Sequence, residues 1–346
     1  MRVAGQWHRT IGLSADGWSV SLIDQTVLPG RFQIIRVTDA EQMAEAIRTM
    51  RVRGAPLIGV AAAFGMALAM RHDPSDAGLE RTYRILDATR PTAVNLRWAL
   101  DRVATVLRPV PAADREARAY QVAEQLADAD VAACQQLGLH GSGLLRSAWE
   151  AIGRARPVAV MTHCNAGWLA TVDWGTALAP VYHAHDAGVP LHVWVSETRP
   201  RNQGLLTAWE LDQHGVPYTV VADNAAGHLM RQGRVDLCLV GTDRVARNGD
   251  VANKVGTYLK ALAASDTGVP FYVAVPSASI DWSSPTGDDI PIEERPGLEL
   301  GHGAVPVLNP AFDVTPARLV TGLLTERGVT EASAAGLDRL FPEQGQ

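Results

Sequence analysis

Residues able to do chemistry follow a series of apolar, strand-like stretches in the C-terminal part of the chain. Five such pairs occur, in chain order: Val158–Met161 with Cys164, Leu191–Val195 with Glu197, Tyr218–Val221 with Asp223, Val235–Val240 with Asp243, and Phe271–Val275 with Ser277. Helix-like segments separate the stretches, which predicts repeated βα units and a buried parallel sheet. Ligands bind at the carboxyl ends of strands in such sheets, so the thiol and the three carboxylates are expected to converge on one crevice. A thiol beside carboxylates indicates an enzyme active site.

Cys164 stands in the polar segment His163–Gly167, which is predicted to follow a strand and to open a helix. Free N–H groups at a helix start lower the pKa of a thiol, which makes it a better base or nucleophile. Most lone cysteines are inert core residues, and Cys134 in a helix and Cys238 in an apolar strand fit that description. The polar neighbours of Cys164 favour a reactive thiol. His163 beside it could be a partner base, and a structural role is the favoured interpretation.

Asp243 follows an apolar strand and lies in Gly241–Lys254, the densest polar segment in this half of the chain. Partial desolvation at a strand end raises the pKa of a carboxyl group, so Asp243 is a candidate general acid. Asn253 and Lys254 are predicted to begin the next helix and to bind an anion there. The alternative for Arg244–Asp250 is a hydrated surface loop with a turn.

Two arginines in the N-terminal part are candidate phosphate ligands. The turn Arg53-Gly54-Ala55 precedes Pro56, and proline suits the first turn of a helix. The N-terminus of a helix favours an anion, and an arginine can add a bidentate grip. Arg97 lies in a later helix-like segment. The alternatives are an ordinary turn with a solvated Arg53 and a surface Arg97.

The elements that position these residues differ between the two parts of the chain. Short strands are predicted over Gly12–Arg36, and helices from Thr38, from Pro56, over Asn95–Val106, and over Arg115–Gln136 with an end near Gly138 and Gly141. The helix after Pro56 is apolar all round and should be buried; its apolar stretch is shorter than the roughly 18–20 residues of a membrane span. The fold class is therefore α/β, with a mainly helical domain and a small strand region over residues 1–140 and a parallel-sheet domain over residues 141–346.

The composition describes an ordinary soluble protein, with 47% hydrophobic and 20% charged residues among 346. A net charge of −6 without a basic block gives no support to nucleic-acid binding. The three cysteines form no metal-ligand spacing and no disulfide framework, and the first residues lack a secretory apolar region. No glycine-rich nucleotide motif follows a strand. These features predict a cytoplasmic protein with no metal, no cofactor and no membrane or nucleic-acid partner.

Several ordered stretches resemble the methylthioribose-1-phosphate isomerases, a family within the superfamily that includes the regulatory subunits of translation initiation factor 2B. The resemblance runs from LIDQTVLP at Leu22–Pro29 to NPAFDVTPARL at Asn309–Leu319. Its motifs are VRGAPLIGVAAAFGMALA, NLRWAL, HCNAG, ETRPRNQG, VADNAAG, GTDRVARNGDVANKVGTY and IPIEERP. The resemblance implies a helical N-terminal domain joined to a Rossmann-like C-terminal domain, usually in a homodimer.

The resemblance also implies a reaction and a set of site residues. The reaction converts the aldose 5-methylthioribose 1-phosphate to the ketose 5-methylthioribulose 1-phosphate in methionine salvage. The family's catalytic cysteine and aspartate fall on Cys164 and Asp243, the residues that the strand ends selected. Its substrate contacts fall on Arg53, Gly54, Ala55, Arg97, Gln203, Asn253 and Lys254.

The implied reaction needs an acid and a base on either side of the sugar. Asp243 is assigned to proton donation at the ring oxygen, and Cys164 to proton handling at C1 and C2. The chain departs from the family pattern in a segment expected to be a helix after Cys164, near the 5-substituent of the sugar. The departures are Trp168, Val172, Asp173 and Trp174.

Two other functions remain as alternatives. One is a related isomerase acting on 5-deoxyribose 1-phosphate or ribose 1,5-bisphosphate, for which Arg199 and Arg201 are the candidate ligands of a second phosphate. The other is a non-catalytic regulatory subunit that binds a sugar phosphate or nucleotide and a protein partner. A retained Cys164 and Asp243 argue against the regulatory subunit, because a binding module has no use for an acid–base pair.

Overall fold

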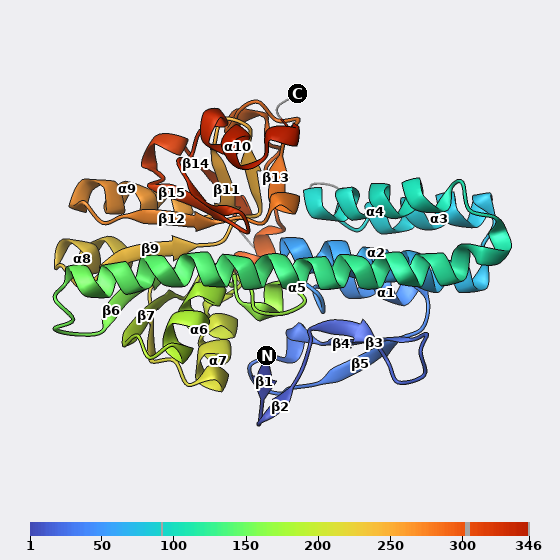
Figure 1. Cartoon of the computed structure of the whole chain (residues 1–346), viewed down its shortest axis with the longest axis horizontal. Coiled ribbons are helices and arrows are strands. Elements are labelled where there is room, and N and C mark those ends of the chain that lie inside the picture. Colours follow the sequence, from blue (N-terminus) through green and yellow to red (C-terminus); the bar gives the residue numbers. More distant parts are fainter. Residues whose placement is uncertain (91–92, 302–304, 345–346) are drawn as a thin grey trace. The chain divides into compact units, whose positions relative to one another are not determined.

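The structure is a computed structural model that describes residues 1–90, 93–301 and 305–344. The chain folds into two compact units. The first unit contains Met1, Val3–Ala132 and Trp168–Asp173; the second contains Arg2, Ala133–Gly167 and the chain from Trp174 onward. Figure 1 shows the elements of both units along the sequence. The two units are described separately below.

The N-terminal segment contains five short strands, all in the first unit except Arg2. These are β1 (Arg2–Val3), β2 (Gln6–Trp7), β3 (Ile11–Leu13), β4 (Val20–Ile23) and β5 (Ile34–Val37). Strand β4 pairs antiparallel with both β3 and β5. Strands β3, β4 and β5 form one sheet, in which Leu22 pairs with Ile11 on one side and with Ile35 on the other. Val20 and Leu22 are fully buried and alternate with a partly exposed Ser21, so one face of the sheet packs on the core.

Four helices and the start of a fifth make up most of the first unit. They are α1 (Ala40–Arg48), α2 (Ala55–His72), α3 (Asp76–Asp87), α4 (Val94–Leu107) and α5 (Ala112–Ala151). The helix predicted to begin at Thr38 begins at Ala40. Asp39 is the N-cap of α1, and its carboxylate accepts the Gln42 N–H at 2.8 Å.

Helix α2 is the core of the first unit, as its apolar sequence predicts. Thirteen of its 18 residues are buried, on all sides of the helix. Its length is greater than the sequence indicated, so by length and composition it could also span a membrane, although 83% of it is buried inside the protein. Burial of this kind is typical of a core helix.

Seven strands form one sheet in the second unit, in the order β16-β15-β12-β9-β6-β7-β8. Strands β15, β12, β9, β6 and β7 of this sheet are labelled in Figure 1. Their bounds are Val158–Thr162 (β6), Leu191–Ser196 (β7), Tyr218–Val221 (β8), Leu237–Val240 (β9), Phe271–Ala274 (β12), Gly322–Thr325 (β15) and Gly328–Thr330 (β16). Only β15 and β16 pair antiparallel within this sheet. The chain runs outward from β6 in both directions, so the switch point of the sheet lies between β6 and β9. This Rossmann-like order confirms the predicted α/β fold class.

Helices connect the parallel strands, and a smaller sheet follows β9. These helices are α6 (Leu178–Asp186), α7 (Gly204–His214), α8 (Ala225–Arg231) and α9 (Thr257–Thr267), and α10 (Ala334–Leu340) follows the last strand. The smaller sheet has the order β13-β10-β11-β14, with β10 (Arg244–Ala246), β11 (Val251–Lys254), β13 (Ile280–Asp281) and β14 (Phe312–Thr315). Single turns of 3-10 helix are η1 (Gln25–Val27), η2 (Trp168–Ala170), η3 (Ser277–Ser279), η4 (Gly287–Asp289), η5 (Gly297–Leu300), η6 (Ala317–Leu319) and η7 (Pro342–Gln344).

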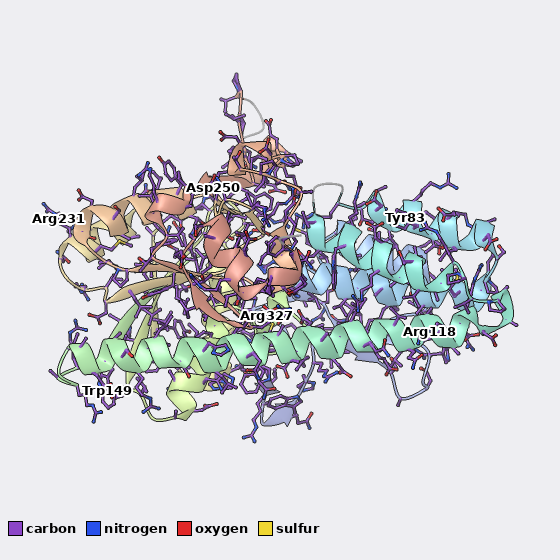
Figure 2. The ribbon with its side chains drawn as sticks, turned by 45° about the horizontal axis from the view of Figure 1, so that its top comes forward. Tyr83, Arg118, Trp149, Arg231, Asp250 and Arg327 are labelled. Atoms are coloured by element: carbon purple, nitrogen blue, oxygen red, sulfur yellow. The ribbon has the colours of Figure 1, made fainter. Side chains whose placement is uncertain are left out.

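The smaller sheet replaces the hydrated loop that was one interpretation of Arg244–Asp250. Strand β10 is buried along its length and turns back into β11. Asp250, labelled in Figure 2, lies in this turn, where its carboxylate accepts the N–H groups of Gly287 at 3.0 Å and Ala317 at 2.8 Å. Asp250 therefore ties the turn between β10 and β11 to η4 and η6.

Helix α5 does not end at Gly138 and Gly141, contrary to the prediction. It continues to Ala151, and both glycines face α6 in the second unit. A Cβ at residue 138 would lie 2.1 Å from the His183 ring, and one at residue 141 would lie 2.4 Å from Pro180 Cγ. These glycines allow two helices to pack closely, and that packing outweighs their weak helix propensity.

Candidate active site

Cys164 lies in a loop at the carboxyl end of β6, and the helix predicted directly after it is absent. Its backbone has a φ of 66°, in the left-handed region. Polar turns and η2 follow, and the next α-helix, α6, begins only at Leu178. The idea that helix N–H groups surround the thiol was therefore wrong. The Cys164 side chain is partly exposed, whereas Cys134 and Cys238 are buried.

Two threonines hydrogen-bond the backbone of Cys164. Its N–H donates to Thr198 Oγ1 at 2.9 Å, and its carbonyl accepts from Thr207 Oγ1 at 2.8 Å. Thr198 belongs to the loop after β7 and Thr207 to α7. Neighbouring Asn165 is buried and donates to Glu210 Oε1 at 2.7 Å. The loop that carries the thiol is thus fixed by polar contacts to the β7–α7 segment.

Asp243 lies at the carboxyl end of β9, the strand next to β6. The two strands are parallel, with Met161 opposite Cys238, so the chain leaves both at the same edge. A Cβ at Gly241 would lie 2.6 Å from the Ala166 Cβ, which shows that the two loops pack together. The structure therefore places the loops of Cys164 and Asp243 on either side of the switch point, where ligands bind in sheets of this kind.

The predicted residues around Asp243 occupy elements that differ from those expected. Asn253 and Lys254 end strand β11 and do not begin a helix, because α9 starts at Thr257. The Asn253 amide donates to Thr257 Oγ1 at 3.0 Å. Lys254 Nζ donates to the Ala311 carbonyl at 2.7 Å. The Asp243 N–H donates to the Ala252 carbonyl at 3.1 Å, which links the acid directly to β11.

Gln203 and Glu197 lie in the loop after β7, where the sequence placed them. Gln203 is the N-cap residue of α7 and is buried, with its carbonyl accepting the Thr207 N–H at 3.2 Å. Arg201 in the same loop pairs with Glu299 at 2.8 Å, and Arg199 Nη2 donates to the Leu300 carbonyl at 3.3 Å. Glu299 thus already neutralises one of the two arginines that a second phosphate would need.

Asp223 does converge on this edge, in a supporting position. Its carboxylate accepts the N–H groups of Thr198 at 2.9 Å and Arg199 at 2.7 Å. Behind it lie His163 Nδ1 and Lys260 Nζ, each 3.9 Å from Asp223 Oδ1. Burial lowers the pKa of His163 to about 3, and the charge of Lys260 adds to this effect. His163 is therefore neutral, with Nε2 donating to the Val255 carbonyl at 2.9 Å.

The neutral, buried His163 should make the protein sensitive to acid. The unfolded chain protonates this ring near its ordinary pKa of 6.5, whereas the folded chain does so only near pH 3. Between these values the unfolded state holds one more proton, so this residue lowers the free energy of unfolding by up to about 1.4 kcal/mol per unit of pH decrease. Urea unfolding of wild type and His163→Gln between about pH 6 and pH 4 should give a shallower pH slope for the variant. Equal pH slopes of the unfolding free energy in the two proteins would contradict a neutral His163 in the folded state.

In the first unit, Arg53-Gly54-Ala55 stands at the start of α2, as the sequence predicts. Gly54 is the N-cap with a φ of 99°, and Pro56 lies in the first turn. A Cβ at residue 54 would lie 2.4 Å from both Cα and O of Ala170. Ala170 belongs to Trp168–Asp173, the part of the first unit that follows the Cys164 loop in sequence. Only glycine satisfies both the backbone angle and the close approach.

Gly54→Ala is therefore expected to lower the free energy of unfolding by at least about 2 kcal/mol, through a strained φ and a backbone clash. Gly12→Ala is the matched control, because Gly12 lies in β3, has no positive φ, and would carry a Cβ with nothing within 4 Å of it. Urea unfolding of the two variants measures the difference. A similar decrease in the free energy of unfolding in both variants would show that the turn at residue 54 does not depend on glycine.

Arg97 lies on α4, with its guanidinium bound to a carboxylate. Its Nε and Nη2 contact the two oxygens of Asp87 at 3.2 and 2.9 Å, and its side chain is 57% exposed. A phosphate ligand and a surface arginine were the two interpretations of this residue. An exposed ion pair of this kind leaves the guanidinium accessible and costs little to exchange for another anion.

The residues that depart from the family pattern are not on an α-helix. Trp168 is fully buried in η2, and its carbonyl accepts the Thr10 hydroxyl at 2.9 Å within the first unit. Asp173 is also buried in the first unit and accepts the Met1 ammonium at 2.7 Å. Trp174, in the second unit, stacks on His183 with ring centroids 4.6 Å apart. These contacts assign the three residues to packing and ion pairing within their own units.

Several residues at this edge carried no signal in the sequence. Thr198, Thr207 and Glu210 look ordinary in a loop and a helix, yet all three are fully buried. Lys260, on α9, is equally inconspicuous and nearly fully buried. Among the residues that the structure describes, no group of three or more His, Cys, Asp or Glu side chains is placed to hold a metal ion.

Comparison with known proteins gives consistent matches over nearly the whole chain. The model of the initiation factor 2 subunit family matches residues 51–332. The methylthioribose-1-phosphate isomerase of Methylobacterium nodulans is 60% identical, covering 99% of both chains, and that of Escherichia coli O45:K1 is 53% identical, covering 99% of this chain and 97% of the relative.

Two solved structures are similar in both sequence and fold. The 5-methylthioribose 1-phosphate isomerase from Pyrococcus horikoshii OT3 has a TM-score of 0.86 and 40% identity, covering 98% of this chain and 97% of that one. The translation initiation factor eIF-2B subunit delta from A. fulgidus has a TM-score of 0.82 and 38% identity, covering 97% and 100%.

Proposed function

The chain belongs to the initiation factor 2 subunit family, and we propose that it converts 5-methylthioribose 1-phosphate to 5-methylthioribulose 1-phosphate. The conversion is an isomerisation of an aldose to a ketose. Relatives named for this activity are 53–60% identical over nearly their full length. The observation that carries the proposal is the placement of a thiol loop and a carboxylate loop on either side of the switch point between β6 and β9.

Asp243 is proposed as the acid that opens the sugar ring. The phosphate on O1 blocks the anomeric oxygen, so the ring cannot open as a free hemiacetal does. A proton delivered to the ring oxygen makes it a neutral leaving hydroxyl and allows the bond from C1 to that oxygen to break. Asp243 follows a buried strand, and a backbone hydrogen bond holds it to β11.

Cys164 is proposed as the base. Formation of the C2 ketone moves one hydrogen from C2 to C1 and removes one proton from the C2 hydroxyl. If the hydrogen moves as a proton, a base takes it from C2 and returns it to C1, and the C2 hydroxyl proton goes to the carboxylate that Asp243 became when it protonated the ring oxygen. If the hydrogen moves as a hydride, a base takes the hydroxyl proton. Both routes need one basic group at C1 and C2, and the partly exposed Cys164 thiol can fill that role as a thiolate.

The remaining predicted residues are proposed as substrate contacts, each from the family resemblance. Arg53, with the turn residues Gly54 and Ala55, offers a guanidinium at a helix start, a combination that suits a phosphate. Arg97 offers a second guanidinium, which would leave its ion pair with Asp87 to bind the phosphate. The other proposed contacts are Gln203, Asn253 and Lys254.

We further propose that the protein acts in methionine salvage in the cytoplasm as a homodimer, with domains over residues 1–140 and 141–346. It is proposed to use no cofactor or metal and to bind neither nucleic acid nor membrane. The net charge of −6 is consistent with a protein that does not bind nucleic acid. Sedimentation of the purified protein tests the homodimer, and a monomer at all concentrations would reject it.

The substrate is tested with three sugars: 5-methylthioribose 1-phosphate, 5-deoxyribose 1-phosphate and ribose 1,5-bisphosphate. The kcat/KM for formation of each ketose should be highest for the methylthio sugar. The bisphosphate should be poor, since Glu299 binds both Arg201 and Arg295, and a second phosphate at Arg201 would have to compete with this shared carboxylate. A higher kcat/KM for another sugar would keep the isomerase and change its substrate. No turnover of any sugar would favour the regulatory subunit, which the likeness to eIF-2B subunit delta keeps as the second candidate.

A further inference from the structure

We propose that Thr198 and Thr207 are positioning residues, which hold Cys164 in the left-handed backbone conformation that directs its thiol. The inference rests on the proposed function of Cys164 as the base. It concerns two residues to which neither a catalytic role nor a substrate contact has been assigned above. Both belong to the β7–α7 segment, and both act on the peptide groups of residue 164.

The backbone of Cys164 is in a conformation that needs support. A φ of 66° places it in the left-handed region, which non-glycine residues adopt only where the surroundings hold them there. Such residues gather at active sites, where they direct a side chain. The loop between β6 and η2 contains no helix or strand, so hydrogen bonds within a helix cannot hold Cys164 in this conformation.

Thr198 holds the N–H side of Cys164. Its hydroxyl oxygen accepts the Cys164 N–H at 2.9 Å, and the hydroxyl proton is directed to the Ser196 carbonyl at 3.0 Å. The threonine is fully buried, so water cannot replace either contact. Its own φ is 65°, which is rare for a β-branched residue. The backbone of Thr198 therefore also needs contacts that keep it in the left-handed region.

Asp223 hydrogen-bonds the backbone at Thr198 and keeps it in this conformation. Its carboxylate accepts the N–H groups of Thr198 and Arg199 at 2.9 and 2.7 Å, and Lys260 Nζ lies 3.9 Å behind it. Bonds from N–H groups to a carboxylate are about twice as strong as those to a neutral acceptor. The left-handed turn at residue 198 is therefore fixed from the carboxyl end of β8, and residue 164 is fixed through it.

Thr207 holds the carbonyl side of Cys164. Its hydroxyl donates to the Cys164 carbonyl at 2.8 Å, and its oxygen accepts the Asn165 amide at 3.2 Å. Thr207 is fully buried in the first turn of α7. Both peptide groups that flank the Cα of Cys164 are thus hydrogen-bonded to side chains from one segment, which leaves little freedom in the φ and ψ that direct the thiol.

The test compares valine and serine at each threonine. Thr198→Val and Thr207→Val keep the β-branched shape and lose the hydroxyl, whereas Thr198→Ser and Thr207→Ser keep the hydroxyl and lose a methyl group. A role in hydrogen bonding predicts harm from valine alone. A role in packing predicts that serine is at least as harmful as valine. Far-ultraviolet circular dichroism shows whether each variant is folded.

The first readout is alkylation of the Cys164 thiol by iodoacetamide, followed by intact mass as a function of pH. Cys164→Ala gives the background, which should be low because Cys134 and Cys238 are buried. The valine variants should be alkylated severalfold faster than wild type, because a loosened loop exposes a thiol that is now partly buried. The serine variants should resemble wild type. Equal alkylation rates in valine and serine variants would overturn the proposal.

The second readout is turnover of 5-methylthioribose 1-phosphate. The valine variants should lose about 10–100-fold in kcat with little change in KM, because the thiol and not the substrate is misplaced. Equal kcat in valine and serine variants would also overturn the proposal. If wild type itself shows no turnover, the proposed function fails, and the alkylation rates still decide whether the two threonines position Cys164.

Discussion

Cys164→Ser is expected to lower kcat about 10²–10⁴-fold, the range that a positioned base contributes, with the protein still folded. Serine has nearly the same shape, and the backbone contacts from Thr198 and Thr207 do not depend on the sulfur. Its hydroxyl is a far weaker acid than a thiol, so it cannot act as an anionic base near neutral pH. The measurement is the initial rate of ketose formation at saturating substrate.

The control for this prediction is Cys134→Ala, which removes a buried cysteine of the second unit. It should lower stability through a lost core contact but leave kcat within about threefold of wild type, since no reacting group is removed. A Cys164→Ser variant with the same kcat as this control would reject Cys164 as the base.

Asp243→Asn is expected to lower kcat to a similar degree, about 10²–10⁴-fold. Asparagine keeps the size and the backbone bond to Ala252, but it has no proton of suitable acidity to give to the ring oxygen. KM should change much less than kcat, because the missing interaction is needed only when the ring opens. The measurement is the pair of constants from initial rates.

The control is Asp266→Asn, a change of the same kind at an exposed position on α9. Its kcat and KM should equal those of wild type. A bulk effect of lost negative charge would lower kcat in both variants. If Asp243 is the proton donor, kcat should fall in Asp243→Asn alone.

Much of the fold was predictable because strand and helix periodicities are local properties of the sequence. The parallel sheet, the burial of α2 and a helix start with Pro56 in its first turn were all predicted. The strand ends also selected Cys164 and Asp243, because buried strands are uninterrupted apolar runs. The strand order, which brings β6 and β9 together, could not be predicted from such local patterns.

The errors have a common physical cause, which is tertiary packing that overrides local preference. Gly138 and Gly141 look like a helix end but allow α5 to pass close to α6. Asn253 and Lys254 precede a helix-like run, yet they pair with β14 as the end of β11. The loop after Cys164 has a helix-like sequence, but its positive φ is held by threonines distant in sequence. Contacts between residues that are distant in sequence cannot be predicted from a local pattern.

The most direct test of the proposed reaction is carbon NMR of 5-methylthioribose 1-phosphate, labelled at C2, with purified wild type and with the Cys164→Ser and Asp243→Asn variants. We expect the wild-type spectrum to gain a ketone carbon signal while the anomeric sugar disappears, and neither variant to form ketone on the same timescale. A wild type that leaves the sugar unchanged, or variants that form ketone as fast as wild type, would contradict the roles of Cys164 and Asp243.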